Sequence, residues 1–465
     1  MDLQLPGWLA DFFGRLLGGY DAEEARKRLP AEIRGDGPAP ASLRRRALRH
    51  VDAELRRSGL VYGSPKLPSR VAQGARLDRA EALFFAVLSG KCFIALDIAR
   101  LHGVPFEPQR SEASLAMLLA AGAGRADLAD EIHALVSMGQ PAFGDGRLLA
   151  RLEQALIDAI APATGDAILD LLLHNATSFA EARVIGRLAI AWYGEEHFDP
   201  AEASRLLAAA ARERAQCLGA LSTIAAPRGG LRERGRRALG KELRKLRLGR
   251  DLERQVRVSF TLPASPEELA GRIRTRTMRR FLVEQLYLAN MLEGREGSPL
   301  LDGLASRLDF GRADRDALEA QVADYFYDPS DVFDAFELRA VGQASSELLV
   351  DRIAREVQLN VDRIALEVKE TGELTQLLAK AAMGQKLTAE ERAKAREQLI
   401  DLAKVVPSLA IIAAPGGMLI FAALLKVLPF SLLPSSFQKR PEDDAPLRPA
   451  AVQPRPRQRR VPRRS

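Results

Sequence analysis

The sequence has few cysteines and none of the short motifs that mark common enzyme classes. Cys92 and Cys217 are the only cysteines in 465 residues, which is too few for a disulfide framework or a clustered zinc site. No glycine-rich phosphate loop, HExxH or paired CxxC occurs. Asp130 and His133 lie one helical turn apart, a spacing more typical of a helix-surface contact than of a metal site. We therefore expect two core cysteines and nominate no catalytic residue, metal or cofactor.

Net charge is also missing from most of the chain. The formal net charge of the chain is +7. All of this positive charge comes from the stretch between Lys426 and Ser465, which contains ten Lys and Arg residues and three acidic residues. The closing RPRQRRVPRRS, with its interleaved prolines, predicts a disordered basic arm. Such an arm favours RNA phosphates or acidic lipid headgroups. Its candidate contacts are Arg457, Arg459, Arg460, Arg463 and Arg464.

Signals for export and for a clean membrane span are absent from the first part of the chain. Asp2 stands where a signal peptide would be positively charged, and no continuous apolar core of the right length follows. The apolar interval from Glu81 to Val104 contains Lys91, Asp97 and Arg100, which argues against a clean span there. We expect a body that stays in the cytoplasm.

What the sequence has in abundance is helical periodicity. Almost every long segment repeats its apolar residues with a period of 3.6, and almost none alternates with period two. Helix starts are marked by capping boxes, as in Ser265 with Glu268 and in Thr388 with Glu391. The predicted fold class is all-α, with multi-domain helical bundles, a C-terminal apolar helical hairpin and a disordered basic tail.

Composition shifts divide the chain into six segments. A Pro/Gly-rich stretch, GDGPAPAS, follows the aromatic-bearing start, and a basic stretch follows the Ala/Leu-rich helices. The predicted segments are an N-terminal segment and linker (1–40), an Ala/Leu-rich helical domain (41–226), a basic helix and linker (227–260), a helical module (261–340), a C-terminal domain (341–438) and the basic tail (439–465).

The basic stretch between Arg228 and Arg257 carries twelve Lys and Arg against four acids. Leu239, Leu243 and Leu246 form a thin apolar seam. Such a seam is typical of a surface helix that packs one face against the rest of the protein and exposes the other to solvent. The alternative is a surface that faces RNA or lipid. For that alternative, the candidate contacts are Arg236, Arg237, Lys241, Arg244, Lys245 and Arg247.

A continuous apolar stripe predicts one long helix in the C-terminal domain. Its positions are spaced by three or four residues, a pattern suited to packing against a partner helix. Gly372 is expected to mark the end of the helix. The stripe consists of Leu349, Ile353, Val357, Val361, Ile364 and Val368.

An uncharged run from Val405 to Leu425 raises the question of a membrane span. Its 21 residues would reach ~31 Å as a straight helix, enough to cross a bilayer. The central Pro415, Gly416 and Gly417 oppose one straight helix, at about 3 kcal/mol for the proline and ~1 kcal/mol for each glycine. A single crossing would also export the Arg-rich tail. A buried or re-entrant hairpin is therefore preferred, and a true span is the alternative.

The same region resembles a known family. LTAEERAKAREQLIDLAKVVP, the apolar segment and KVLPFSLLPSSF are together similar to the ribosome-binding-like domain of the leucine-zipper, EF-hand-containing transmembrane (LETM) family, in its bacterial form. The clear match covers about residues 385–438. The residues that carry it are Pro407, Pro415, Gly416, Gly417, Pro429, Leu433, Pro434, Ser435 and Phe437.

Mitochondrial members of the LETM family are inner-membrane proteins linked to potassium/proton exchange and to ribosome association. The resemblance thus implies a non-enzymatic protein in the cytoplasm, associated with the inner membrane, that docks to ribosomes, to anionic membrane lipid or to both. The alternative it implies is a component of cation transport. No acid, Lys or Arg lies between Val405 and Leu425 to relay an ion. The segment DPSDVFDAFELR lacks the glycine and the final glutamate of an EF-hand, so calcium regulation is not implied.

Two weaker likenesses concern the earlier segments. FIALDIARLHGVPFEP is similar to the EcsC-type helical domain, and residues 270–325 resemble the tellurite-resistance TerB fold, with Glu293 and Gly294 where that family has Asp-Gly. Neither likeness implies catalysis.

Overall fold

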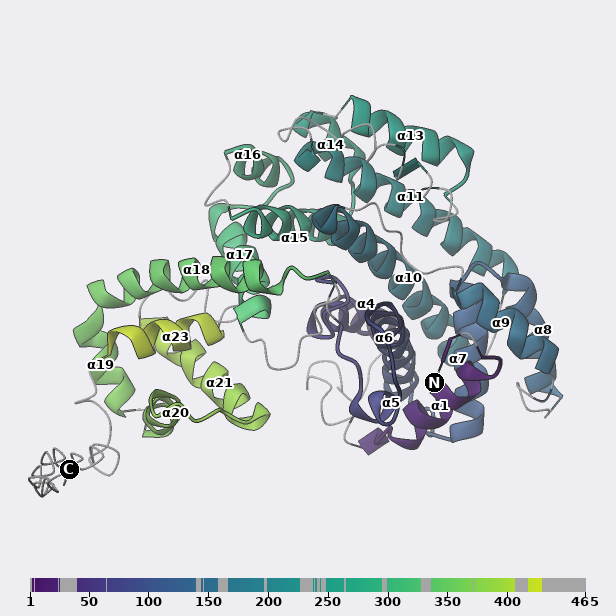
Figure 1. The fold of residues 1–465 in the computed structure, drawn as a ribbon, viewed down its shortest axis with the longest axis horizontal. Helices are drawn as coiled ribbons and strands as arrows, with labels where there is room; N and C mark the ends of the chain where they lie inside the picture. The colour runs from purple at the N-terminus through teal and green to yellow at the C-terminus, as the bar shows by residue number, and fades with distance from the viewer. Residues whose placement is uncertain are drawn as a thin grey trace, which may run out of the picture.

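The computed structural model describes residues 2–3, 5–23, 25, 40–63, 65–138, 144, 146–157, 166–195, 199–225, 237, 239–240, 243, 248–262, 265–294, 299–327, 336–370, 372–405 and 417–428. These residues contain 19 helices and no strand, so the predicted all-α fold is confirmed (Figure 1). The predicted tail at 439–465 lies outside them.

The first eleven helices run from the N-terminus to residue 272, and the remaining eight complete the described chain. The first group is α1 (Trp8–Gly18), α4 (Pro40–Arg57), α5 (Ser69–Ala72), α6 (Arg79–Leu101), α7 (Pro108–Gly122), α8 (Ala126–Ser137), α9 (Gly146–Ile157), α10 (Ala167–Glu195), α11 (Pro200–Ala225), α13 (Arg250–Thr261) and α14 (Pro266–Arg272). The second group is α15 (Arg276–Leu292), α16 (Pro299–Arg307), α17 (Arg312–Tyr327), α18 (Arg339–Leu359), α19 (Val361–Glu370), α20 (Gly372–Ala382), α21 (Ala389–Val405) and α23 (Gly417–Val427).

Two clusters of buried side chains organise these helices. We call the cluster between Trp8 and Phe326 the N-terminal core, and the cluster between Ala320 and Leu424 the C-terminal core. Helix α17 contributes to both, because Phe326 belongs to the first and Ala320 to the second. Figure 1 shows α17 between α15 and α18, where the two cores meet. The predicted boundaries at 226 and 260 fall within the N-terminal core, which joins helices from both sides.

Helices α6 and α10 form the centre of the N-terminal core. They pack against each other, and α10 also contacts α4, α7 and α11. Among the described helices, α6 alone is long and apolar enough to cross a membrane, yet 78% of its most apolar window is buried inside the fold. Its Lys91 is paired with Glu181 at 2.6 Å, and its Asp97 with His50 at 2.8 Å. Here α6 is a core helix whose charges have protein partners.

The N-terminal helix α1 is part of this core. The ring of Trp8 packs edge-on against Phe84 and Phe85 of α6. Glu153 of α9 is buried and accepts hydrogen bonds from the backbone N–H groups of Gly7 and Leu9. A carboxylate at a helix N-terminus satisfies donors that the helix leaves open and complements its dipole. The aromatic start of the chain is therefore anchored by packing and by a long-range cap.

Buried polar groups connect the first helices to α15. Glu284 of α15 accepts hydrogen bonds from Arg56 of α4 and from Arg280 one turn earlier in α15. The neighbouring Gln285 accepts from Asn175 of α10 and donates to the carbonyl of Val61. Glu284 and Gln285 are both fully buried. These contacts fix how α4, α10 and α15 lie relative to one another.

The predicted single long helix of the C-terminal domain is two helices. Helix α18 ends at Leu359 and α19 begins at Val361, with Asn360 between them. The Asn360 side chain donates to the carbonyl of Glu356, and its backbone N–H bonds to Val357. Asparagine competes locally for backbone hydrogen bonds and so favours helix ends. The apolar period continues across this break, which is why the sequence pattern suggested one helix.

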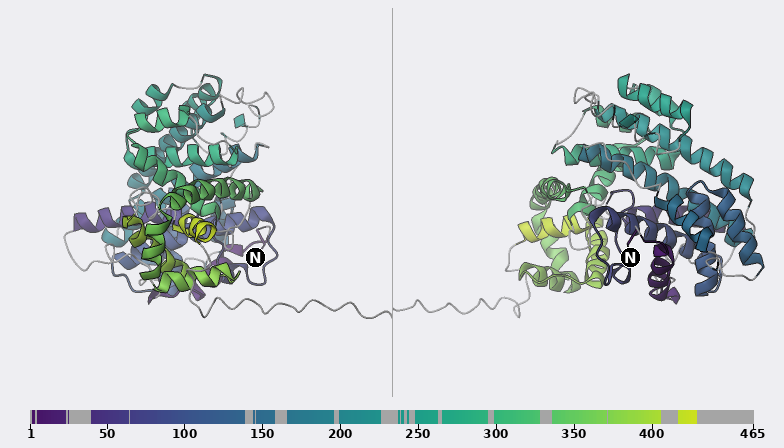
Figure 2. Two further views of the ribbon diagram at one scale, coloured as in Figure 1. Left: turned by 90° about the vertical axis from the view of Figure 1, so that its left-hand side faces the viewer. Right: turned by 45° about the vertical axis from the view of Figure 1, so that its right-hand side comes forward.

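Helix α23, the second half of the apolar run, is an internal element of the C-terminal core. Leu419, Phe421 and Leu424 are buried, and the helix packs against α17, α18, α20 and α21. In Figures 1 and 2, α23 (yellow) lies among these helices in every view. Helix α23 also packs beside α21. Residues 406–416, which connect these two helices, lie outside the described residues, so the predicted hairpin stays a prediction.

Candidate functional site

Gly417 is the one residue of the LETM-like motif that the described residues include. It begins α23, and a Cβ atom at this position would collide with Cγ of Arg396 on α21. Glycine therefore allows the two helices to approach closely. The other motif positions lie outside the described residues: Pro407, Pro415, Gly416, Pro429, Leu433, Pro434, Ser435 and Phe437.

The start of α23 is held by a buried carboxylate that no sequence motif indicated. Asp324 of α17 accepts a hydrogen bond from Arg396 at 2.8 Å and one from the backbone N–H of Met418 at 3.0 Å. Burial raises the pKa of Asp324 to about 6, although Arg396 and the N–H groups of α23 act in the opposite direction. Asp324 lies 94 positions before Met418, so no local pattern could have shown this contact.

The basic stretch of the sequence is docked through its apolar seam. Leu239 and Leu243 are buried in the N-terminal core, as expected for a helix with one docked face. Arg257 of α13 donates to the carbonyl of Gly240 at 2.7 Å and joins the two parts of the stretch. Arg237 is exposed. The remaining candidate contacts lie outside the described residues: Arg236, Lys241, Arg244, Lys245 and Arg247, with Arg457, Arg459, Arg460, Arg463 and Arg464 of the tail.

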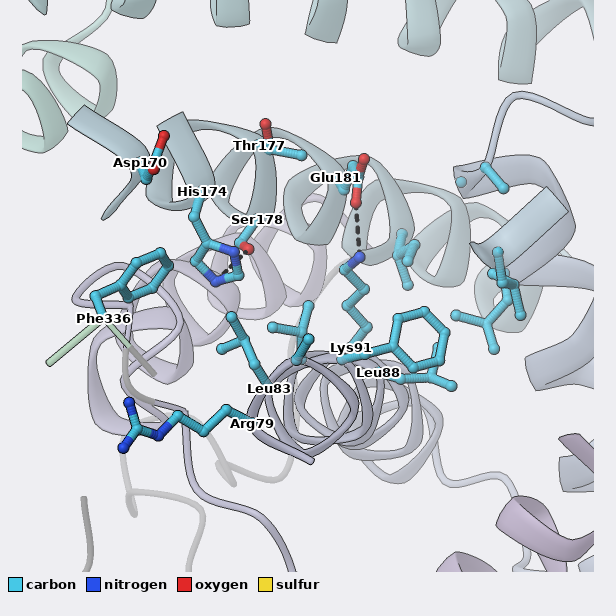
Figure 3. A pocket seen from close by; sticks show the side chains of 18 of the residues that line it. Arg79, Leu83, Leu88, Lys91, Asp170, His174, Thr177, Ser178, Glu181 and Phe336 are labelled. Carbon is cyan, nitrogen blue, oxygen red and sulfur yellow. Dashed lines mark hydrogen bonds and ion pairs between the residues drawn. The ribbon is translucent and has the colours of Figure 1, made fainter. Parts of the chain in front are cut away.

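A cavity of about 430 Å³ lies between α6 and α10 in the N-terminal core. Most of its wall is apolar and includes Leu83 and Leu88 of α6, and Figure 3 shows Leu83 pointing toward α10. Further wall residues come from the end of α7 and from Phe336. The volume is within the range of pockets that hold small molecules in proteins. We take this cavity as the candidate functional site.

One face of α10 gives the cavity a row of polar side chains. Asp170, His174, Ser178 and Glu181 are spaced by four, four and three residues, so they share a face of the helix. Thr177 lies beside them and also lines the cavity. Figure 3 shows His174, Ser178 and Glu181 on the side of α10 that faces α6. The sequence predictions missed these residues, although a polar row within an apolar helix is a signal that the sequence contains.

His174 is the most buried ionisable group of the cavity wall. It is 4% exposed, its Nε2 lies 3.3 Å from the hydroxyl of Ser178, and its ring stands 5.5 Å from that of Phe336. Burial lowers the pKa of His174 to about 4, and Lys91 adds to the effect. The imidazole is therefore neutral at pH 7. Its Nδ1 has no hydrogen-bond partner, and neither has the hydroxyl of Thr177. An unsatisfied buried polar group costs roughly 1–3 kcal/mol.

Lys91, Glu181 and Arg79 of the cavity wall form ion pairs within the protein. Glu181 accepts from Lys91 at 2.6 Å and from Arg214 of α11 at 3.1 Å. Burial acts to raise the pKa of Glu181, but Lys91 and Arg214 outweigh it and lower that pKa. At the rim, Arg79 pairs with Glu337. The wall therefore combines these ion pairs with an uncharged histidine and the side chain of Asp170.

This arrangement favours binding over nucleophilic catalysis. Asp170, His174 and Ser178 stand in the order of a charge-relay chain along α10, but His174 Nδ1 has no hydrogen-bond partner. Such catalysis requires an acid that orients the histidine through that nitrogen. The connection is absent here, so Ser178 is not activated in the way that a catalytic serine is.

A second polar cluster connects α4 with α6. In the described residues, His50, Glu54 and Asp97 form the one group whose spacing could hold a metal ion. His50 is hydrogen-bonded to Asp97 at 2.8 Å, and Glu54 pairs with Arg57. Burial raises the pKa of Glu54, while Arg57 opposes that effect. The carboxylate of Asp97 is bonded to His50 and that of Glu54 to Arg57. The cluster is therefore explained as an internal hydrogen-bond network.

Comparison with known proteins adds no relative. No family model, no curated protein and no solved structure matches the chain. The likenesses to the LETM, EcsC and TerB families stay predictions from the residues quoted for them.

Proposed function

We propose that the protein is a non-enzymatic helical docking protein whose C-terminal unit is a LETM-type domain that binds ribosomes. The observation that carries the proposal is the placement of α23. This helix belongs to the resembling segment, and it is buried in the C-terminal core with its start held by Asp324. A segment used in this way forms part of a folded module, which suits docking better than crossing a bilayer.

The charge distribution supplies an attachment mechanism for this module. Nine Lys and Arg lie between Lys439 and Ser465, after the buried helix in the sequence. Basic chains bind RNA by neutralising phosphates and releasing counterions, so their affinity falls as salt rises. The same chemistry attracts them to anionic lipid, which accounts for the proposed association with the inner membrane. The docked basic stretch around Arg237 would add a second cationic surface.

Co-sedimentation with purified ribosomes over a salt series tests the proposal. The full chain is compared with a chain that ends at Gln438 and with a variant whose five terminal arginines (457, 459, 460, 463 and 464) are changed to glutamine. Both variants should bind more weakly, and the slope of log affinity against log salt should fall by about 0.7 to 0.9 for each phosphate that the tail no longer neutralises. Changing the same arginines to lysine keeps the charge and should preserve most of the binding.

The ribosome assignment fails if removing the tail leaves co-sedimentation unchanged. A parallel series with vesicles of anionic and of neutral lipid separates the two partner classes. Tail-dependent binding to anionic vesicles without binding to ribosomes would make the membrane the partner.

Cation transport, the alternative that the resemblance implies, has no observation in its favour among the described residues. The helix that could span a membrane by length, α6, is mostly buried within the N-terminal core. Helix α23 has 11 residues, or ~16 Å, and is too short to span. Cation flux in vesicles that contain the purified protein would revive this alternative.

A further inference from the structure

We infer that the cavity between α6 and α10 binds one small amphipathic molecule: a single hydrocarbon chain with an uncharged head that offers an oxygen acceptor to His174. This inference is independent of the docking proposal, because it concerns the N-terminal core.

The shape of the cavity selects a chain-like ligand. Its wall includes residues from Asp170 to Ile185 on α10, a stretch of about 22 Å along the helix axis. The volume of about 430 Å³ is nearly three times the ~150 Å³ of an engineered cavity that takes up benzene. Spread over that length, it leaves room for one extended hydrocarbon chain and not for fused rings side by side.

The wall of the cavity selects an apolar body. The lining includes Leu83, Val87 and Leu88 of α6 and Ile185 of α10, and Figure 3 shows Phe336 at the end near His174. Contact with such side chains removes apolar ligand surface from water, which is the main source of affinity in pockets of this kind.

The polar row fixes the head of the ligand. When the hydroxyl of Ser178 donates to Nε2 of His174, the ring proton is on Nδ1, which then requires an acceptor. Nδ1 is buried without a protein partner, so an oxygen atom of the ligand would complete its hydrogen bonding.

The electrostatics of the cavity select an uncharged head. Lys91 and Arg214 share Glu181, and Arg79 is paired with Glu337 at the rim. His174 is neutral at pH 7 because burial opposes its protonation. A carboxylate head would enter without an available counter-charge, and an unpaired buried charge is strongly unfavourable. An ammonium head has no acceptor to offer to Nδ1 of His174.

Equilibrium dialysis of the full chain tests the inference with three probes of equal chain length. Dodecanol has an uncharged oxygen, dodecane has none, and dodecanoate has a charged head. We expect one dodecanol per chain, dodecane bound at least tenfold more weakly, and dodecanoate bound no more tightly than dodecanol. Absence of dodecanol binding, or equal affinity for dodecanol and dodecane, would overturn the inference.

Two variants test whether the ligand binds in this cavity. Ala123→Leu adds bulk to the cavity wall and should weaken the binding of dodecanol and dodecane alike by tenfold or more. Its control, Ala134→Leu, makes the same change at an exposed position of α8 and should leave binding unchanged. His174→Phe keeps a ring but removes Nδ1, so it should lower dodecanol affinity to that for dodecane while dodecane affinity is kept.

Retained dodecane binding shows that the His174→Phe protein is folded, which separates loss of the hydrogen bond from loss of the cavity. If that variant still prefers dodecanol over dodecane, His174 does not hold the head. If Ala123→Leu leaves dodecanol binding intact, the cavity is not the site.

Discussion

Arg56 and Glu284 lie 228 positions apart in the chain and form a two-pronged ion pair. Nε of Arg56 donates to Oε1 of Glu284 at 2.6 Å, and Nη2 donates to Oε2 at 2.9 Å. The side chains are 8% and 0% exposed. A bidentate arginine–carboxylate pair fixes geometry as well as charge. The pair therefore sets the position of α4 on α15 in the N-terminal core.

Removal of the Glu284 charge should destabilise the N-terminal core strongly. Glu284→Gln leaves the buried Arg56 without a counter-charge, and breaking a buried pair in this way costs about 3–5 kcal/mol. Urea unfolding followed by tryptophan fluorescence measures the loss, because Trp8 and Trp192, the two tryptophans of the chain, both pack in this core. The control is Asp127→Asn, which removes an exposed pair with Arg125 and should cost under ~1 kcal/mol. Equal effects of the two changes would contradict the role given to Glu284.

His174 should make the N-terminal core less stable in acid. Its pKa is lowered from 6.5 to about 4 by burial, so the unfolded chain binds more protons between these values. Stability is then full above pH 6.5 and is lost as pH falls towards 4, by at most about 3 kcal/mol from this group. Tryptophan-monitored urea unfolding at several pH values should show this slope, and His174→Phe should flatten it. An unchanged slope in that variant would exclude His174 as its source.

Asp324 should give the C-terminal core the opposite pH dependence. Its pKa is raised from 3.8 to about 6 by burial, so the folded chain binds more protons between these values. The contribution is full below pH 4 and is lost as pH rises through 6, again by at most about 3 kcal/mol. Hydrogen exchange of the α23 amides, corrected for intrinsic rates, measures the local stability. Asp324→Asn should remove this dependence, and a variant that retained it would show that another group titrates.

Close packing at Gly417 should make even a methyl group costly. Gly417→Ala places a Cβ against Cγ of Arg396, whose guanidinium also bonds Asp324. Overpacking of this kind costs typically about 1–3 kcal/mol, which should appear as faster hydrogen exchange in α23. Gly372→Ala at the start of α20 is the control, since a Cβ there meets nothing within 4 Å. Comparable exchange in the two variants would disprove the close approach of the helices.

Local sequence signals predicted the local features of the structure. The capping boxes of Ser265 with Glu268 and of Thr388 with Glu391 are confirmed, because their partners lie three residues apart. Cys92 and Cys217 are buried thiols, as their scarcity suggested. The break at Asn360 was missed because the apolar period runs through it.

Long-range contacts could not be predicted from periodicity and capping. The spacing of Asp170, His174 and Ser178 already places them on one face of a helix, but it does not say that α6 lies opposite at a distance that leaves a cavity. Which helices meet is decided by the summed packing of both cores. The contact of Asp324 with Met418 depends on that packing and has no counterpart in any short stretch of sequence.

The charges of α6 also matter before the protein has folded. Lys91 lies near the middle of this helix, where a lysine adds about 2.5–3.5 kcal/mol to the free energy of insertion into a bilayer. Its counter-ion, Glu181, belongs to α10 and is synthesised 90 residues later. Until then we expect the charge of Lys91 to oppose insertion of the emerging segment into a bilayer. Lys91→Leu should therefore favour insertion of the nascent segment into lipid, and it also removes the closest cation from Glu181 in the folded core.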